Sequence, residues 1–171
     1  MMAEWKLEIG DHVHYGAHGV CLVKNRETKD LGSMKRDYFV MQPAGKDNIL
    51  LYLPVDADPE KVKFRRLLSR QEILDLIHNA EDPSEWISDS KLRREAWNKM
   101  LHSGDMAQLI RMVRLLYAHQ QELPAGKQLP MSDQEIMRAA ERQIYSEFSY
   151  VLELQEDQVL PFILQEAGEN P

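Results

Sequence analysis

The spacing of hydrophobic and polar positions changes near residue 58. Before that point, short runs of β-branched, aromatic or apolar residues alternate with turn residues. The runs cover residues 13–15, 20–23, 38–41 and 49–53, and glycine, aspartate and proline separate them. Runs of strand length bounded by turn residues are typical of a small β-domain. We therefore expect a strongly bent β-barrel in this region.

After Pro59 the apolar positions repeat at helical spacing. Helices are expected over residues 69–79, 90–101, 106–120 and 132–150, followed by a short apolar segment at 159–164 that Pro161 interrupts. Ser69 with Glu72, and Ser132 with Glu135, have the spacing of a capping box. The predicted fold class is therefore α+β, with a small β-barrel over residues 1–58 and a compact all-helical domain over residues 59–171.

Charge is distributed unevenly, although the net charge of −7 makes the whole chain an anion. Residues 61–114 hold 11 lysines and arginines and 8 acidic residues, whereas residues 115–171 hold 3 basic and 10 acidic residues. Because salt screens electrostatic fields over roughly 8 Å, a locally basic surface can still meet phosphate groups. The net charge therefore does not exclude contact with DNA.

Several classes of protein are disfavoured by what the sequence lacks. Glycine-rich phosphate loops and the H-E-x-x-H zinc motif are absent, and capping explains the serines at helix starts. His12, His14 and His18 are the best metal candidates, but exposed strand histidines explain them better. Cys21 lies in an apolar strand pattern and is interpreted as structural. We expect no enzymatic activity, no metal and no cofactor.

The N-terminus lacks the apolar core of a signal peptide. No later apolar stretch approaches the roughly 18 residues that a membrane-spanning helix needs. We therefore expect a cytoplasmic protein with no membrane contact.

A tryptophan precedes three basic residues near the start of the expected helix at residue 90. These residues are Trp86, Lys91, Arg93 and Arg94. Cations can neutralise DNA phosphates, and an aromatic ring can insert at a partly unstacked base step. The alternative is that Trp86 or Trp97 fills the core between helices and the cations only cover a hydrated surface. The spacing alone favours this alternative.

Two segments resemble the CarD family. Residues 9–20 are similar to its opening signature, G-D-x-V-x-Y-x-x-H-G-V, and Ser103-Gly104-Asp105 with the following helix resembles the core of its second domain. Between them, the similarity continues through a charged strand with Arg26 and Lys29, a turn at Gly32, the strand 38–40 and the closing Leu53-Pro54-Val55. The resemblance therefore covers most of the chain.

This resemblance implies a Tudor-like β-barrel that docks on the β subunit of RNA polymerase, as the related domain of the transcription-repair coupling factor does. It also implies a helical domain at the upstream edge of the promoter bubble, where a tryptophan wedges into the minor groove and basic residues contact phosphates. By analogy, the polymerase-binding residues would be Arg26, Lys29, Leu51 and Tyr52, and the DNA-binding residues Trp86, Lys91, Arg93 and Arg94.

The sequence departs from the family pattern at the tryptophan. Family members read W-x-x-R-Y before the helix, and counting back from Ser103 without gaps puts Ser90 at the tryptophan position. Arg94 replaces the tyrosine, and Trp86 lies four residues early. Either the helix begins one turn sooner with Trp86 as the wedge, or the wedge is lost.

Two hypotheses follow. The first is a non-enzymatic bacterial transcription regulator that binds the polymerase β subunit and contacts upstream promoter DNA, weakly on its own, to modulate the stability of the open complex. The second is a protein-interaction adaptor without direct DNA contact, in which Trp86 is buried and the acidic C-terminal third binds a basic partner. We expect a monomer.

Overall fold

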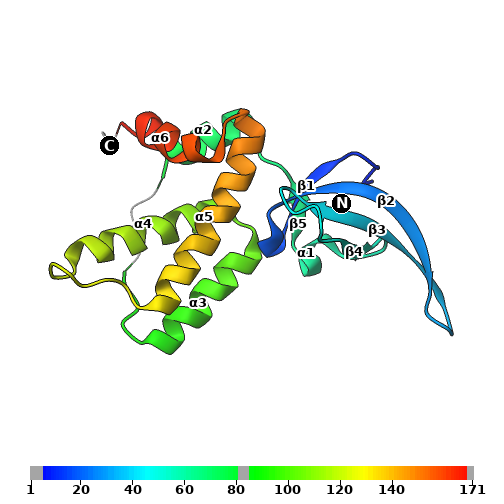
Figure 1. Ribbon diagram of the computed structural model, residues 1–171, viewed down its shortest axis with the longest axis horizontal. Coiled ribbons are helices and arrows are strands. Elements are labelled where there is room, and N and C mark those ends of the chain that lie inside the picture. Colours follow the sequence, from blue (N-terminus) through cyan, green and yellow to red (C-terminus); the bar gives the residue numbers. More distant parts are fainter. Residues whose placement is uncertain (1–5, 81–84, 169–171) are drawn as a thin grey trace.

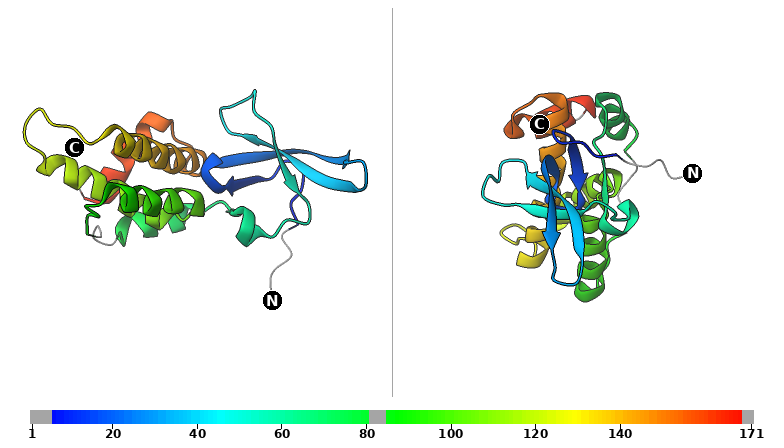
Figure 2. Two further views of the ribbon diagram at one scale, coloured as in Figure 1. Left: turned by 90° about the horizontal axis from the view of Figure 1, so that it is seen from below. Right: turned by 90° about the vertical axis from the view of Figure 1, so that its right-hand side faces the viewer.

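The computed structural model describes residues 6–80 and 85–168. It places a β-sheet and a group of helices at opposite ends of an elongated molecule (Figure 1, Figure 2). The sheet end contains β1 (His12–Tyr15), the 3-10 helix η1 (Gly16–His18), β2 (Val20–Asp30), β3 (Lys35–Pro43), β4 (Leu51–Pro54), α1 (Pro59–Val62) and β5 (Phe64–Arg66). The helical end contains α2 (Arg70–His78), α3 (Ser90–Ser103), α4 (Met106–Glu122), α5 (Met131–Leu152) and α6 (Glu156–Glu166). The predicted α+β class is confirmed.

The five strands form one antiparallel sheet in the order β4-β3-β2-β1-β5. The expectation of a barrel needs correction, because β4 and β5 are the two edges of an open sheet. The long β2–β3 hairpin supplies the strong bend that the turn pattern predicts, and it curves away from the helices (Figure 1). Strand β5 was not predicted, because three residues are too few to show alternation. The sheet therefore includes one more strand, which follows the domain boundary expected at residue 58.

Each end of the molecule has its own hydrophobic core. The core of the sheet contains Leu7, Val13, Cys21, Val23, Phe39, Met41, Leu53 and Phe64. Cys21 is fully buried, and burial raises the pKa of its thiol to about 12, which agrees with a structural role. The helical core is larger and includes Trp97, Leu109, Leu116, Ile144 and Phe148.

Helix starts follow their capping chemistry. Ser69 and Glu72 form the predicted capping box at the start of α2. The second predicted box is wrong, because α5 begins at Met131 directly after Pro130, whose fixed φ suits a helix start. At the C-terminal end, α6 continues through Pro161, where an interruption was expected. Within the described ranges, none of the helices combines the length and hydropathy needed to span a bilayer.

Candidate functional site

An aromatic and basic patch lies beside the edge strand β4. The Nζ atom of Lys29 lies 3.3 Å from the centroid of the Tyr52 ring, and the ring of Tyr38 meets Tyr52 edge-on at 6.3 Å. Tyr52 is 39% exposed. We call Lys29, Tyr38 and Tyr52 the edge patch. Among the described residues, β4 pairs only with β3, so its other side offers backbone groups to a partner.

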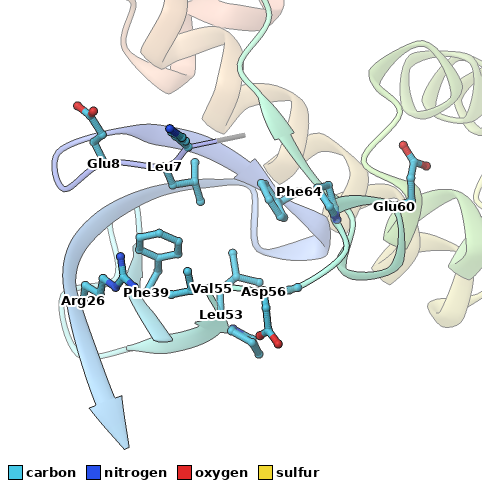
Figure 3. A pocket seen from close by; sticks show the side chains of 13 residues that line it. Leu7, Glu8, Arg26, Phe39, Leu53, Val55, Asp56, Glu60 and Phe64 are labelled. Atoms are coloured by element: carbon cyan, nitrogen blue, oxygen red, sulfur yellow. The ribbon is translucent and has the colours of Figure 1, made fainter. Parts of the chain in front are cut away.

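The other two expected polymerase-binding residues lie on the opposite face of the sheet. Alternation along β2 and β4 turns Arg26 and Leu51 toward the side that carries the core. Arg26 donates a 2.8 Å hydrogen bond to Asp37 at the rim of a groove of about 800 Å³, beside Phe39 (Figure 3). Leu51 packs against the core. The structure therefore brings Lys29 and Tyr52 together and separates them from Arg26 and Leu51.

Trp86 lies in an aromatic cluster at the helical end. Its ring stacks on His119 with the centroids 3.6 Å apart and the planes 7° from parallel. It also meets Trp97 edge-on at 5.4 Å. Trp86 is half-buried, whereas Trp97 is only 2% exposed. The cluster thus holds the indole of Trp86 in one orientation while leaving part of it at the surface.

Arg93 is a buried partner of this cluster. Its guanidinium carbon lies 4.6 Å from the centroid of the Trp86 ring, and the residue is 5% exposed. Its Nη2 donates to Asp133 at 2.9 Å, and its Nη1 donates to the backbone carbonyl of Ile87 at 2.8 Å. The Arg93 guanidinium therefore packs against the Trp86 ring inside the helical domain and does not face solvent.

The remaining two expected DNA-binding residues are exposed on the first turns of α3. Lys91 and Arg94 are three residues apart, so they lie on one side of the helix. Asp89 caps the helix by accepting hydrogen bonds from the backbone N–H groups of Lys91 and Leu92. The helix therefore begins at Ser90, and the expectation that it begins one turn sooner is wrong. This corrects the position of the helix start only, and a wedge role for Trp86 does not depend on its lying within the helix. Trp86 lies in the segment that leads into it.

The three histidines that were the best metal candidates, His12, His14 and His18, contact different partners. The ring of His12 packs on Tyr150 at 4.5 Å, and the ring of His18 stacks on Tyr15 at 5.5 Å. His14 is fully buried and turns its Nδ1 toward Glu147. In the part of the chain that the structure describes, no three histidine, cysteine or acidic side chains are grouped as metal ligands would be.

A buried cluster joins the two ends of the molecule, and the sequence analysis did not identify it. We call its members His14, Arg65, Gly104 and Glu147 the interdomain joint. Glu147 on α5 is fully buried and accepts hydrogen bonds from both terminal nitrogens of Arg65 on β5, at 2.9 and 2.8 Å. A glutamate on the core face of a helix was the available signal, because a buried carboxylate needs a cationic partner.

The electrostatics of the joint favour a charged carboxylate. Burial raises the pKa of Glu147, but this rise is outweighed by the hydrogen bonds and charge of Arg65, the nearby His14 ring and the hydrogen bond from the backbone N–H of Leu68. The resulting pKa is about 2. Glu147 therefore carries its negative charge at neutral pH inside the contact between the two domains.

Comparison with protein families covers both ends of the molecule. Residues 7–64 match the model described as CarD-like/TRCF RID domain. Residues 72–163 match the model described as CarD, C-terminal domain. The first match contains the edge patch, and the second contains Trp86, the exposed cations of α3 and Glu147.

Proposed function

The chain belongs to the CarD-like family of transcription-associated proteins that interact with RNA polymerase, and we propose that it regulates transcription at the promoter. It is a non-enzymatic regulator that binds the polymerase β subunit through the sheet and contacts upstream promoter DNA through the helical domain. By holding both partners, it modulates the stability of the open complex. Its place of action is the cytoplasm, where bacterial polymerase works.

The observation that carries the polymerase part is the edge patch at β4, an edge strand that pairs with β3 on one side. A strand at a sheet edge can accept a strand of a partner by main-chain hydrogen bonds, and neighbouring side chains then give specificity. Tyr52 lies on this edge strand and Lys29 lies on β2, and a cation–π contact holds the two side chains together. The proposed docking surface is therefore the β4 edge with Lys29 and Tyr52, while Leu51 supports the strand from the core.

Binding experiments can distinguish the two faces of the sheet. We expect Lys29→Glu and Tyr52→Ala to weaken binding of the full chain to the polymerase β subunit at least about tenfold, as loss of an interface hot spot does. Arg26→Glu is the matched control on the opposite face and should leave the affinity within about twofold. If Arg26→Glu abolished binding while Lys29→Glu did not, the polymerase surface would be the groove in Figure 3.

The DNA part rests on the partly exposed Trp86 with Lys91 and Arg94 nearby. Lys91 and Arg94 are free to approach phosphates, and Arg93 holds the aromatic ring rather than the DNA. Two cations give weak attraction for DNA alone. Docking on polymerase compensates, because it raises the local concentration of the helical domain at the promoter.

Trp86→Ala tests the role of the ring. We expect this variant to keep its affinity for polymerase and to lose the effect on open-complex lifetime, because the surface that reaches the base step is gone. His119→Ala removes the stacking partner but keeps the indole, so it should retain most of the effect. Equal loss in both variants would mean that Trp86 acts only by packing.

The adaptor hypothesis keeps one supporting observation, the packing of Trp86 among Trp97, Arg93 and His119. Under that hypothesis, the ring is shielded and the protein never touches DNA. Fluorescence quenching by a polar quencher, compared between the wild type and Trp86→Phe, measures how far water reaches this indole. Crosslinking from residue 86 to promoter DNA in the polymerase complex would reject the adaptor hypothesis.

A further inference from the structure

The two sequence motifs that mark the ends of the molecule meet at the interdomain joint. His14 comes from the opening motif on β1, and Gly104 comes from the Ser-Gly-Asp turn between α3 and α4. A Cβ atom added to Gly104 would lie 3.1 Å from Cδ2 of His14, closer than ordinary contacts. Gly104 also accepts a 3.0 Å hydrogen bond from Nε of Arg65 at its carbonyl oxygen. A side chain at this position would therefore push His14 away by a few tenths of an ångström, and glycine allows the observed close approach of the turn to the sheet.

Glu147 is the centre of the joint because its two oxygens contact β1, β5 and the link that follows β5. Oε1 accepts from Arg65 on β5 and, at 2.8 Å, from the backbone N–H of Leu68 in the link to α2. Oε2 accepts from Arg65 and lies 3.3 Å from Nδ1 of His14 on β1. These contacts need one relative position of α5 and the sheet. A bidentate guanidinium–carboxylate pair is directional, so it resists rotation more than apolar packing does.

The other contacts between the domains come from η1, β1 and β2. The 3-10 helix η1 packs against α3 and α5, and Gly19 lies close to Ser146 on α5. The ring of His12 packs on Tyr150 near the end of α5. Among the residues that the structure describes, the two hydrophobic cores are separate clusters, so no continuous apolar core fixes the angle between the domains.

We propose that Glu147 is a positioning residue, which fixes the angle between the sheet and the helical domain by holding Arg65 and His14. This inference rests on the proposed function in one respect: with the sheet docked on polymerase, the angle determines whether Trp86 and α3 reach the promoter. Loss of the joint leaves both binding surfaces intact and uncouples them.

The test compares Glu147→Gln with wild type in the full chain. Spin labels at the exposed positions 47 and 121, one in each domain, report the interdomain distance by pulsed electron paramagnetic resonance, with the buried Cys21 replaced by alanine. We expect a single narrow distance in wild type and a broad distribution in Glu147→Gln. Asp133→Asn is the matched control, because it weakens a buried ion pair within the helical domain and should leave the distance narrow.

The second readout is open-complex lifetime at equal polymerase occupancy. We expect Glu147→Gln to bind polymerase within about twofold of wild type and to shorten the lifetime by roughly 2- to 30-fold, the range for residues that couple two sites. Arg65→Lys keeps the charge but loses the bidentate geometry, and it replaces Glu147→Gln if that variant does not fold. It should broaden the distance in the same way.

The outcomes separate the two proposals. An unchanged distance distribution in folded Glu147→Gln and Arg65→Lys would overturn the positioning role, whatever the transcription assay shows. A broadened distribution with unchanged open-complex lifetime would overturn the claim that the angle matters for promoter contact. If wild type itself had no effect on open complexes, the proposed function would fail, and the distance measurement would still decide the role of Glu147.

Discussion

At the scale of single residues, Arg93 shows how burial changes the role of a cation. Its position near Trp86 suggests a phosphate contact, but its guanidinium is inside the helical domain and bound to Asp133. Alternation of exposed and buried positions in a helix explains the difference, because Lys91 and Arg94 turn outward where Arg93 turns inward. The start of α3 therefore exposes fewer cations than its sequence suggests.

Asp133→Ala should destabilise the helical domain strongly. Removing the carboxylate leaves a buried guanidinium without its counter-charge, which costs about 3–5 kcal/mol of unfolding free energy. Urea unfolding followed by circular dichroism measures the change. Asp56→Ala removes the partner of Arg36 in an exposed ion pair and should cost no more than about 1 kcal/mol. Equal losses in the two variants would contradict the structural role of Arg93.

A pair of glycines separates backbone strain from steric contact. Gly104 and Gly126 both have positive φ, at +69° and +82°, so alanine is strained by about 1 kcal/mol at each. Only at Gly104 does an added Cβ meet a neighbour, His14, since nothing lies within 4 Å at Gly126. We expect Gly104→Ala to lower the unfolding free energy by roughly 1–3 kcal/mol more than Gly126→Ala does. Equal effects in thermal unfolding would show that the joint tolerates a methyl group.

At the scale of elements, the sequence predicted those structures whose causes are local. Helices α2 to α5 were predicted within a few residues of their ends, because apolar spacing and capping act over one or two turns. The capping box at Ser69 was right for the same reason. The predicted capping box at Ser132 was wrong, because α5 begins one residue earlier, after Pro130, and has no side-chain cap.

The first turns of α3 should make a small, salt-dependent contribution to promoter binding. Lys91→Gln with Arg94→Gln removes two phosphate contacts, and each contact contributes about −0.9 to the slope of log affinity against log salt. We therefore expect the slope to become less negative by about 2 for the polymerase-bound protein on promoter DNA. Arg138→Gln on the exposed surface of α5 is the control. An unchanged slope in the double variant would remove α3 from the DNA contact.

At the scale of the whole molecule, the relation between the two domains was not predictable from the sequence. His14, Arg65 and Glu147 come together only through the folded chain, and Glu147 is 82 residues from Arg65. A local pattern does not reveal such a contact. Glu147 was therefore not predicted as a site residue, and His14 was interpreted as an exposed strand residue. The open sheet was missed for a similar reason, since barrel closure depends on whether two distant edges meet.

Acid should release the joint before either core unfolds. The pKa of Glu147 is lowered to about 2 in the folded protein, from 4.5 for a free side chain. A lowered pKa means that an opened or unfolded state binds the proton more readily. The joint is therefore fully stabilised above about pH 4.5 and loses this stabilisation, on the order of 3 kcal/mol, as the pH falls toward 2.

The interdomain distance measured against pH tests this directly. The wild-type distribution should broaden between about pH 4.5 and 2, whereas Glu147→Gln should be broad throughout, because it has no charge to lose. Glu72 is a matched control: hydrogen bonds from Arg66 and Ser69 also lower its pKa to about 2, but it is exposed and outside the joint. Glu72→Gln should follow the wild-type curve. If the wild-type distance stayed narrow until the helices melted, the angle would be held by packing of η1 and Gly19 on α3 and α5, and the charge of Glu147 would not control it.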